Sequence, residues 1–484
     1  MSVYKKLFKQ TLIYGIAAVI PKMIGFIMAP LHMQWLPDNA YGNYTLIFSW
    51  MMFFNVILAF GMETAFFRFY NKRENKKEVI NNSIWYLFLV SFVFLGIAFL
   101  FKNDIDHYFE IQPVVTTFLL WILVLDTLVV IPFAILRAHQ RPVKYSAIRI
   151  MNVTVNALLT IFFLYLLPII IKETDSEFFK AMYRPHFEVG YVFLSNLIAS
   201  IFTLIVLSKY YLKLRFHFNI QLWKDMLTYG FPVMIAGLAF VVNETFDKVF
   251  LKELLPEETA VFDVARYGAC YKLGVFMVLF RMAYTLGIEP FFFSYAKNDD
   301  APTKYATITK YFVLCGSLMM LVIIVFADFI KQFYITNENF WSAMEIVPYI
   351  ILANLMLGIY TNLSVWYKLQ DKTKIGAYIS VAGAVVTVLF NFILIPYLGI
   401  LGSAITTLIA YAFMMTVSYI LGQKSYPIPY DKKAIGLYLG SSVLFSYIYF
   451  YNFRENYIVG ITFLLLFIAL IAYKEQKLIQ RILK

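Results

Sequence analysis

Three basic side chains, Lys22, Lys272 and Arg281, stand within long apolar stretches of the sequence. A charged side chain at the centre of a bilayer costs about 2.5–3.5 kcal/mol on insertion scales, so such a residue is expected to have a partner or a function. Lys and Arg bind phosphate groups through charge-assisted hydrogen bonds. We therefore predict that these cations form part of a site for an anionic group at membrane depth.

The three positions differ in how strongly they favour a binding role. Lys22 lies ten residues into its apolar segment, between Pro21 and Gly25, and we expect it to face a cavity; the alternative is an ion pair with a carboxylate. Lys272 lies nearer a segment end, where a long side chain can also reach the membrane surface. Nine residues separate it from Arg281, which on an ideal helix gives roughly opposite faces.

A polar stripe is predicted on another segment. Arg149, Asn152 and Asn156 are spaced i, i+3 and i+7, and this spacing lines one face of a helix. Such a stripe faces either a water-filled cavity or a neighbouring helix through side-chain hydrogen bonds. The spacing favours neither alternative.

Three carboxylates are candidates for binding a coupling ion. Asp126 lies in the middle of an apolar segment, where it could carry a proton or pair with a buried cation. Glu244 and Asp247 flank a segment end, where they could bind a cation or form a helix cap or an ion pair. We expect H⁺ or Na⁺ as the coupling ion and no other cofactor.

The elements that position these residues are predicted to be membrane helices. The chain is 61% hydrophobic and 14% charged, whereas soluble domains carry about 25% charged residues. Apolar runs of about 20 residues span a bilayer as helices. We predict an all-α integral membrane protein with about fourteen such segments: 12–35, 44–67, 82–101, 114–136, 147–167, 187–207, 226–242, 267–293, 306–326, 346–366, 376–395, 400–421, 434–450 and 457–473.

The distribution of basic residues predicts the orientation. With fourteen helices, 29 of the 41 Lys and Arg fall in the termini and loops of one side, nine fall on the other side and three lie at membrane depth. Basic loops stay in the cytoplasm, so both termini are predicted to be cytoplasmic. These loops facing anionic lipid explain most of the net charge of +12, and no nucleic-acid partner is expected.

A weak internal repeat predicts two lobes. Tyr14 and Gly15 open the first segment, and Tyr229 and Gly230 open the seventh, 215 residues later. Six-helix halves in the same orientation form the parallel repeats of some transporters, with a cavity between them. The predicted domains are an N-terminal lobe at 1–215, a C-terminal lobe at 216–424, and two further helices with a tail at 425–484.

One stretch carries a family resemblance. Residues 391–407, NFILIPYLGILGSAITT, resemble the eleventh-to-twelfth helix signature of the multidrug/oligosaccharidyl-lipid/polysaccharide (MOP) exporter superfamily, and of its polysaccharide, or O-antigen, flippase branch most closely. The stretches 229–232 and 267–273 follow that family's order. The alternative for Pro396, Gly399 and Gly402 is a tight turn with close helix packing and no ligand.

The resemblance implies a flippase of the bacterial inner membrane. Its substrate would be a polyprenyl-pyrophosphate oligosaccharide, moved by alternating access to the periplasmic leaflet for cell-surface polysaccharide assembly. Lys22 matches a place in the first helix where the family commonly has a basic residue. Membrane lipid, the lipid-linked oligosaccharide and other polysaccharide-assembly proteins are the implied partners.

Two alternatives remain open at this point. A cation-coupled drug or metabolite exporter of the same superfamily usually has twelve helices, and a membrane polysaccharide polymerase or ligase usually has a large periplasmic loop. Catalysis is not expected, because the five His show no metal-ligand spacing and no phosphate-binding glycine loop is present.

Overall fold

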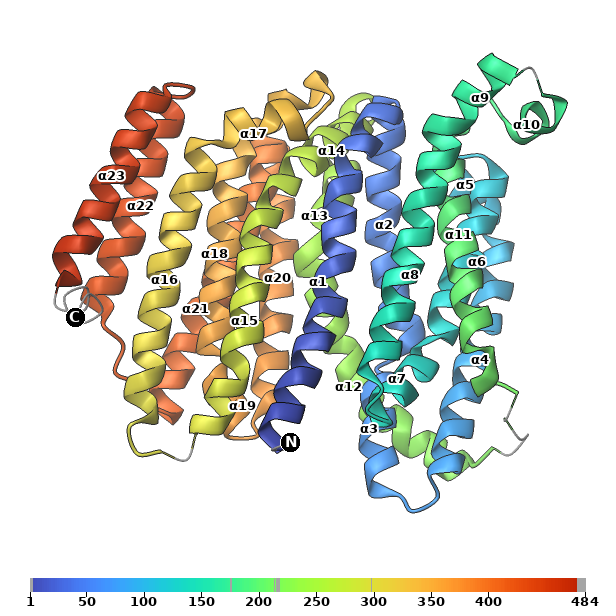
Figure 1. Cartoon of the computed structure of the whole chain (residues 1–484), viewed down its shortest axis with the longest axis horizontal. Helices are drawn as coiled ribbons and strands as arrows, with labels where there is room; N and C mark the ends of the chain where they lie inside the picture. Colours follow the sequence, from blue (N-terminus) through green and yellow to red (C-terminus); the bar gives the residue numbers. More distant parts are fainter. Residues whose placement is uncertain (1–2, 175, 213, 215–217, 297, 477–484) are drawn as a thin grey trace. The chain divides into compact units, whose positions relative to one another are not determined.

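The computed structural model describes residues 3–174, 176–212, 214, 218–296 and 298–476. Every regular element in these ranges is a helix, and they contain no strand, which confirms the predicted all-α class (Figure 1). The chain divides into two compact units, Met1–Val249 and Phe250–Lys484. The predicted lobe boundary, at residues 215 and 216, lies outside the described residues, so the repeated lobes stay a prediction.

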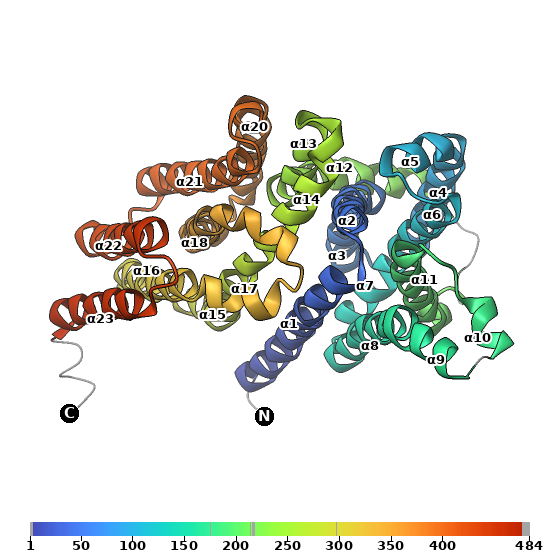
Figure 2. The ribbon, with the colours of Figure 1, turned by 90° about the horizontal axis from the view of Figure 1, so that it is seen from above.

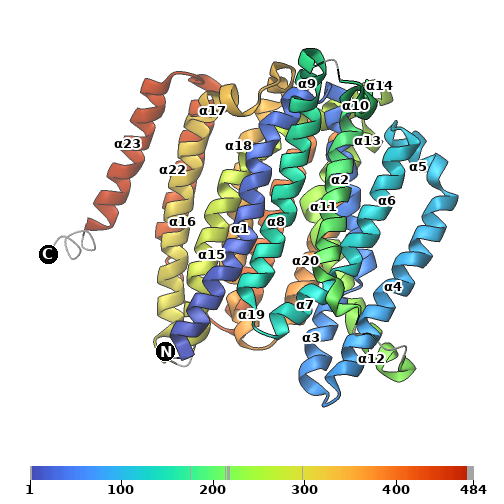
Figure 3. The same cartoon turned by 45° about the vertical axis from the view of Figure 1, so that its right-hand side comes forward.

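Unit 1 is built from helices α1 to α12. It contains α1 (Val3–Trp35), α2 (Asp38–Ala59), α3 (Met62–Lys72), α4 (Lys76–Leu100), α5 (Lys102–Phe109), α6 (Pro113–Leu128), α7 (Val130–Ala138), α8 (Pro142–Ile161), the π-helix η1 (Phe162–Leu166), α9 (Leu167–Thr174), α10 (Glu177–Met182), α11 (Glu188–Leu207), the 3₁₀ turn η2 (Ser208–Tyr210) and α12 (Ile220–Thr245). Helices α8, η1 and α9 form one continuous rod (Figure 3), against which α1 packs.

Unit 2 begins within α13 (Asp247–Leu254), whose first three residues belong to unit 1. It contains α14 (Glu257–Tyr271), the 3₁₀ turn η3 (Lys272–Gly274), α15 (Val275–Tyr295), α16 (Ala301–Val325), α17 (Ala327–Tyr334), the 3₁₀ helix η4 (Glu338–Ile346), α18 (Val347–Leu363), α19 (Val365–Leu369), α20 (Thr373–Leu398), α21 (Ile400–Ser425), α22 (Lys432–Asn452) and α23 (Tyr457–Lys474). Helix α21 packs against both α18 and α20.

Twelve helical spans among the described residues are long and apolar enough to cross a membrane. Each overlaps one of the fourteen predicted segments. The remaining predictions, 12–35 and 267–293, are also helical, since α1 covers the first and α14, η3 and α15 cover the second. The second is interrupted by a 3₁₀ turn, and the count of fourteen is not confirmed.

Glycine interrupts the second predicted segment. Helix α2 ends at Phe60 and α3 begins at Met62, because Phe60 and Gly61 both adopt positive φ angles, of 48° and 66°. A Cβ atom on Gly61 would lie 2.5 Å from the carbonyl oxygen of Gly230 in α12. The break therefore lets two helix backbones touch within unit 1, and only glycine meets both requirements.

The stretch 391–407 forms the tight helical hairpin α20–α21. Gly399 joins the two helices at a φ of 59°, and a Cβ on Gly402 would lie 2.5 Å from the carbonyl oxygen of Leu394. The predicted structural role of these glycines, a tight turn with close packing, is confirmed. Pro396 lies inside α20, which continues to Leu398.

A buried ion-pair network ties α17 to the loop between α22 and α23. The Asp328 carboxylate, whose side chain is 2% exposed, accepts two hydrogen bonds from Arg454 at 2.7 Å and one from Lys331 at 2.6 Å. Burial alone would raise the pKa of Asp328, but hydrogen bonds and charge from the two cations outweigh it and hold that pKa below its ordinary value.

A second polar contact holds the other end of the same helical pair. The Glu475 carboxylate, just after α23, accepts hydrogen bonds from Lys310 of α16 and Tyr438 of α22, both at 2.7 Å. Helices α22 and α23 also pack along α16 (Figure 2). The α22–α23 pair is therefore attached at both ends to the rest of unit 2.

We predict that Asp328→Asn lowers the free energy of unfolding by about 3 kcal/mol, because two cations lose their buried partner. This value is at the low end for a buried pair, since Arg454 is 34% exposed. The loss is measured as a lower melting temperature in detergent at pH 7. The lowered folded-state pKa makes this stabilisation complete above about pH 4, and it disappears as the pH falls further.

The matched control is Asp300→Asn. Asp300 and Lys304 form an exposed pair at 3.9 Å, for which less than about 1 kcal/mol is expected. Equal melting temperatures for the two variants at pH 7 would contradict the assigned role of Asp328, as would a difference that stays constant down to pH 3.

Candidate functional site

In unit 1, the predicted carboxylate Asp126 lies where α6 meets α11. Its side chain is half-buried, and it accepts a hydrogen bond of 2.9 Å from the hydroxyl of Ser200. Arg149 of α8 is close enough for an electrostatic interaction with this carboxylate. A carboxylate within an apolar span needs such donors. The role of Asp126 in coupling stays a prediction.

The predicted polar stripe of α8 has three different environments. Arg149 is exposed and lies over the ring of Phe133, with 4.6 Å between the guanidinium carbon and the ring centroid. Asn152 donates from Nδ2 to the Ala199 carbonyl at 3.0 Å and to the Thr203 hydroxyl at 2.9 Å. Asn152 thus bonds to α11, whereas Arg149 keeps an exposed guanidinium that a ligand can reach.

Asn156, the last residue of the stripe along α8, makes a weaker contact than Asn152. Its Oδ1 accepts from the Thr160 hydroxyl on the same helix at 3.5 Å, a length at which hydrogen bonds are weak. Its side chain is half-buried. Within the polar stripe, Asn152 is therefore hydrogen-bonded to α11, whereas Asn156 makes only a weak contact within its own helix.

Lys22 lies on α1 with an exposed side chain, between Pro21 inside the helix and Gly25. Its neighbour three residues on, Gly25, has space around it, because a Cβ there would meet nothing within 4 Å. A cation with this exposure can reach a ligand, which is the arrangement that a binding role needs. The role of Lys22 as a cavity cation stays a prediction.

The carboxylates at the end of α12 lie in unequal surroundings. Asp247 is buried, and its Oδ1 pairs with Nζ of the adjacent Lys248 at 2.7 Å. Glu244 is half-buried one turn earlier. The ion-pair alternative therefore describes Asp247, although the pair is buried rather than exposed.

In unit 2, the predicted cations Lys272 and Arg281 stand on different elements. Lys272 opens the 3₁₀ turn η3, and Arg281 lies within α15; both side chains are half-buried. A 3₁₀ turn rotates by about 120° per residue instead of 100°. The ideal-helix rotation used to place these two residues on opposite faces does not hold across η3.

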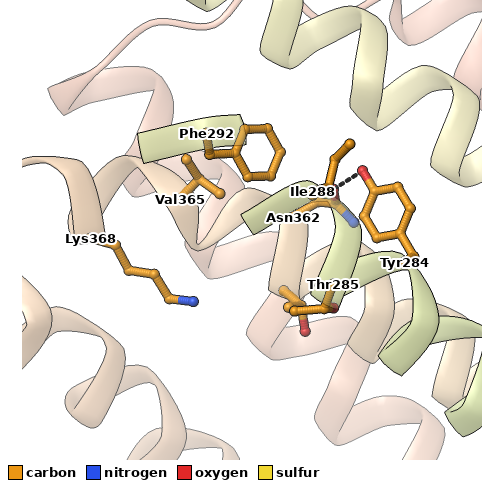
Figure 4. Close-up of a pocket in the computed structure, with 8 residues that line it drawn as sticks. Tyr284, Thr285, Ile288, Phe292, Asn362, Val365 and Lys368 are labelled. Atoms are coloured by element: carbon orange, nitrogen blue, oxygen red, sulfur yellow. Dashed lines mark hydrogen bonds between the residues drawn. The ribbon is translucent and has the colours of Figure 1, made fainter. Parts of the chain in front are cut away.

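A pocket lies between α15 and α18–α19, one turn from Arg281 (Figure 4). The pocket is partly open to the outside, and its enclosed space is about 20 Å³, enough for roughly one water molecule. One wall is apolar and the other is polar. The lining residues are Tyr284, Thr285, Ile288, Phe292, Thr361, Asn362, Val365 and Lys368.

The polar wall is ordered by hydrogen bonds. The Tyr284 hydroxyl donates to Oδ1 of Asn362 at 2.6 Å, and Nδ2 of Asn362 donates to the Gly358 carbonyl at 3.1 Å. The Thr285 hydroxyl donates to the carbonyl of Arg281 at 2.8 Å. These donors are used, but the hydroxyl oxygens can still accept, and Lys368 adds a cation to the wall.

Arg281 lies close to Gly358, whose carbonyl accepts the hydrogen bond from Asn362. Its Cδ lies 3.8 Å from the position that a Cβ on Gly358 would take. The absence of a side chain at Gly358 makes room for the Phe312 ring, whose Cζ lies 2.6 Å from that Cβ position, and the Arg281 stem lies in van der Waals contact beside it. No pattern in the sequence indicates this pocket beyond Arg281 itself, because its residues come from α15 and from α18 and α19, which are about 75 positions further along the chain.

Metal binding finds no support in the described residues, among which no group of three or more His, Cys, Asp and Glu could hold an ion. Apart from the carboxylates Asp126, Glu244 and Asp247, the candidate functional side chains are cations, amides and hydroxyls. Such groups bind anions and sugars by hydrogen bonding.

Comparisons with known proteins agree with this architecture. The family described as "Polysaccharide biosynthesis protein" matches residues 7–296, and the MatE family matches residues 232–393. "Lsg locus putative protein 1" from Haemophilus influenzae is 21% identical over 431 residues, covering 85% of this chain and 99% of its own.

Solved structures show the same fold. The "Lipid II flippase MurJ, inward closed conformation" superposes with a TM-score of 0.73 at 15% identity, covering 97% of this chain and 100% of its own. A MOP superfamily transporter from Pyrococcus furiosus superposes with a TM-score of 0.59 at 14% identity, covering 87% and 95%.

The match to the polysaccharide biosynthesis family, the MatE match and the twelve apolar helical spans identify a multi-pass membrane protein of the MOP superfamily. Within it, the chain belongs to the polysaccharide biosynthesis protein family, whose match covers more than half of the sequence. The resemblance noted in residues 391–407 is thereby confirmed at the level of the superfamily and its polysaccharide branch.

We predict that Asn152→Ala lowers the melting temperature in detergent more than Asn156→Ala does. The first change removes two interhelical hydrogen bonds to α11, each worth about 0.6 kcal/mol in membrane proteins, and the second removes one weak contact. The two changes share residue type and helix, so differences in helix propensity cancel. Equal shifts would show that the α8–α11 contact does not depend on Asn152.

Proposed function

We propose that this protein is a flippase for a lipid-linked oligosaccharide. It moves the polyprenyl-diphosphate head group and sugars from the cytoplasmic to the periplasmic leaflet by alternating access, and both termini lie in the cytoplasm of a bacterial cell. The observation that carries the proposal is the exposed side chain of Lys22 on α1, a helix predicted to cross the membrane, in a chain of the polysaccharide biosynthesis family. Arg281 supports it from unit 2.

The physical argument concerns the diphosphate. Moving an anion from water into hydrocarbon costs several kcal/mol or more unless hydrogen-bonding partners replace the lost water. Lys and Arg replace that water with charge-assisted hydrogen bonds. The polyprenyl tail is apolar and can stay in the bilayer, so only the head needs a polar route.

The second candidate is an exporter of the same superfamily for a soluble compound. The match of residues 232–393 to the MatE family favours it. Against it stands the extent of similarity, because the flippase fold covers 97% of this chain, whereas the Pyrococcus transporter covers 87%. The longer match favours the flippase.

We predict that purified protein flips a polyprenyl-diphosphate oligosaccharide in proteoliposomes and that Lys22→Ala slows this by about tenfold or more. A charge-assisted hydrogen bond is worth about 1.5–3 kcal/mol, and 1.4 kcal/mol is tenfold. Flipping is read as accessibility of the sugar to an added glycosidase, with proton and sodium gradients imposed separately.

Lys433→Ala is the control, since Lys433 is exposed in the first turn of α22, and it should flip at the native rate. Absence of flipping by native protein under every gradient, with export of a soluble cation in the same vesicles, would favour the exporter. A native rate for Lys22→Ala would remove that residue from the substrate path.

A further inference from the structure

The segment between α9 and α11 presents aromatic side chains at the end of a long helical rod. Helix α9 ends at Thr174, and the short helix α10 packs against it (Figure 1). Phe178 of α10 is 69% exposed, and Tyr183, directly after α10, is exposed as well. The half-buried ring of Phe179 lies 5.3 Å from that of Phe178. A group of exposed apolar side chains of this kind marks an interaction surface.

Hydrogen bonds fix the base of this segment to α11. The Tyr191 hydroxyl donates to the Met182 carbonyl at 3.0 Å and accepts from the Arg184 amide at 2.6 Å. The Tyr191 ring stacks on Phe163 of η1, with 5.2 Å between the ring centroids. One side chain therefore ties α10 to the rod formed by α8, η1 and α9, and the exposed aromatic side chains are carried by a fixed backbone.

The length of the rod places α10 at a membrane surface. The rod runs from Pro142 to Thr174, and its residues 150–171, between Arg149 and Lys172, contain no charged side chain. These 22 residues are about 33 Å long at about 1.5 Å per residue, close to the roughly 30 Å of a bilayer's hydrocarbon core. Lys172 then lies at the level of the lipid head groups, and α10, which packs against α9, lies at that level too.

The composition of the segment favours lipid over a charged partner. Residues 172–186 contain three basic and three acidic side chains, so the segment has no net charge with which to attract an acidic or a basic partner. Aromatic rings beside Lys and Arg are typical of the membrane interface. The rod also exposes Leu158, Tyr165 and Leu166, as a helix that faces lipid does.

We propose that residues 176–184 are an interfacial anchor, in which Phe178 enters the lipid surface at head-group level while the neighbouring Glu177 stays in water. The anchor fixes the depth of the rod in the bilayer. Because α1 packs against α8, it also fixes the depth of the helix that carries Lys22. The inference goes beyond the proposed function, since it holds whichever compound the protein moves.

The test uses spin labels at Phe178→Cys and Glu177→Cys in the full-length protein, on a Cys270→Ala, Cys315→Ala background, in liposomes of zwitterionic lipid. Oxygen concentrates in hydrocarbon, whereas a nickel chelate stays in water. We expect the label at Phe178→Cys to be more accessible to oxygen than to nickel. Glu177→Cys is the matched control, because the native Glu177 side chain is 90% exposed on the same helix, and its label should be more accessible to nickel.

Three outcomes would overturn the anchor. Greater accessibility of the Phe178→Cys label to nickel than to oxygen would show that this position lies in water. Low accessibility to both reagents would show that protein covers it, as in a complex with a second copy or another partner. Accessibility to oxygen that appears only after anionic lipid is added would show electrostatic instead of apolar recognition.

Tyr191→Phe tests how the anchor is positioned. The change keeps the aromatic ring but removes the hydroxyl that holds Met182 and Arg184. We expect the spectrum of the Phe178→Cys label to show greater mobility and its preference for oxygen to fall. An unchanged spectrum would overturn the positioning role of Tyr191. The melting temperature of each variant shows whether a changed spectrum reflects unfolding.

Discussion

The cost of placing charge in hydrocarbon governs this structure. Each charged or polar group within the membrane helices must replace the water that it loses. Asp126 does so with the Ser200 hydroxyl, and Asp247 does so with Lys248. Lys22 has an exposed side chain on α1. An anionic ligand that enters the membrane loses water in the same way. A cation of the protein and an anion of the ligand can each replace the water that the other loses.

Two ion pairs in unit 2 attach helices to one another. Asp328 binds Arg454 at one end of the α22–α23 pair, and Glu475 binds Lys310 at the other. Asp328, Arg454 and Glu475 lie outside the apolar spans, where charge is less costly, whereas Lys310 lies within the span of α16. Because both ends are fixed to α16 and α17, we expect the pair to move with unit 2 as one body. Such attachment suits a transporter whose mechanism depends on large parts moving without internal distortion.

Much of the fold followed from the sequence because membrane helices are specified by length and composition. Twelve of the predicted segments correspond to spans of the required length, and the hairpin at 391–407 followed from Pro396, Gly399 and Gly402. The interruptions of the predicted segments could not be predicted from the sequence. The break at Gly61 depends on contact with Gly230, which is distant in sequence, and the 3₁₀ turn η3 leaves no periodic signal because its flanking residues are apolar in either geometry.

In the candidate site, too, some residues could be predicted from the sequence and others could not. Single charges in apolar runs, such as Arg281, are visible in a sequence because each is costly on its own. The pocket around Lys368 was not visible, since it forms where Tyr284 and Asn362 meet from separate helices and none of its residues is unusual alone. Equally, spacing grouped Asn152 with Arg149, but only packing could show that Asn152 is bonded to α11.

The central proposal is that the cations Lys22 and Arg281 bind the diphosphate of a lipid-linked oligosaccharide. The most direct measurement compares flipping rates of the native protein for one oligosaccharide on three polyprenyl carriers: diphosphate, monophosphate and neutral glycoside. The account predicts the fastest flipping for the diphosphate and a fall of about tenfold or more for the neutral carrier, because only the anions gain charge-assisted hydrogen bonds. Equal rates for the diphosphate and the neutral glycoside would contradict it.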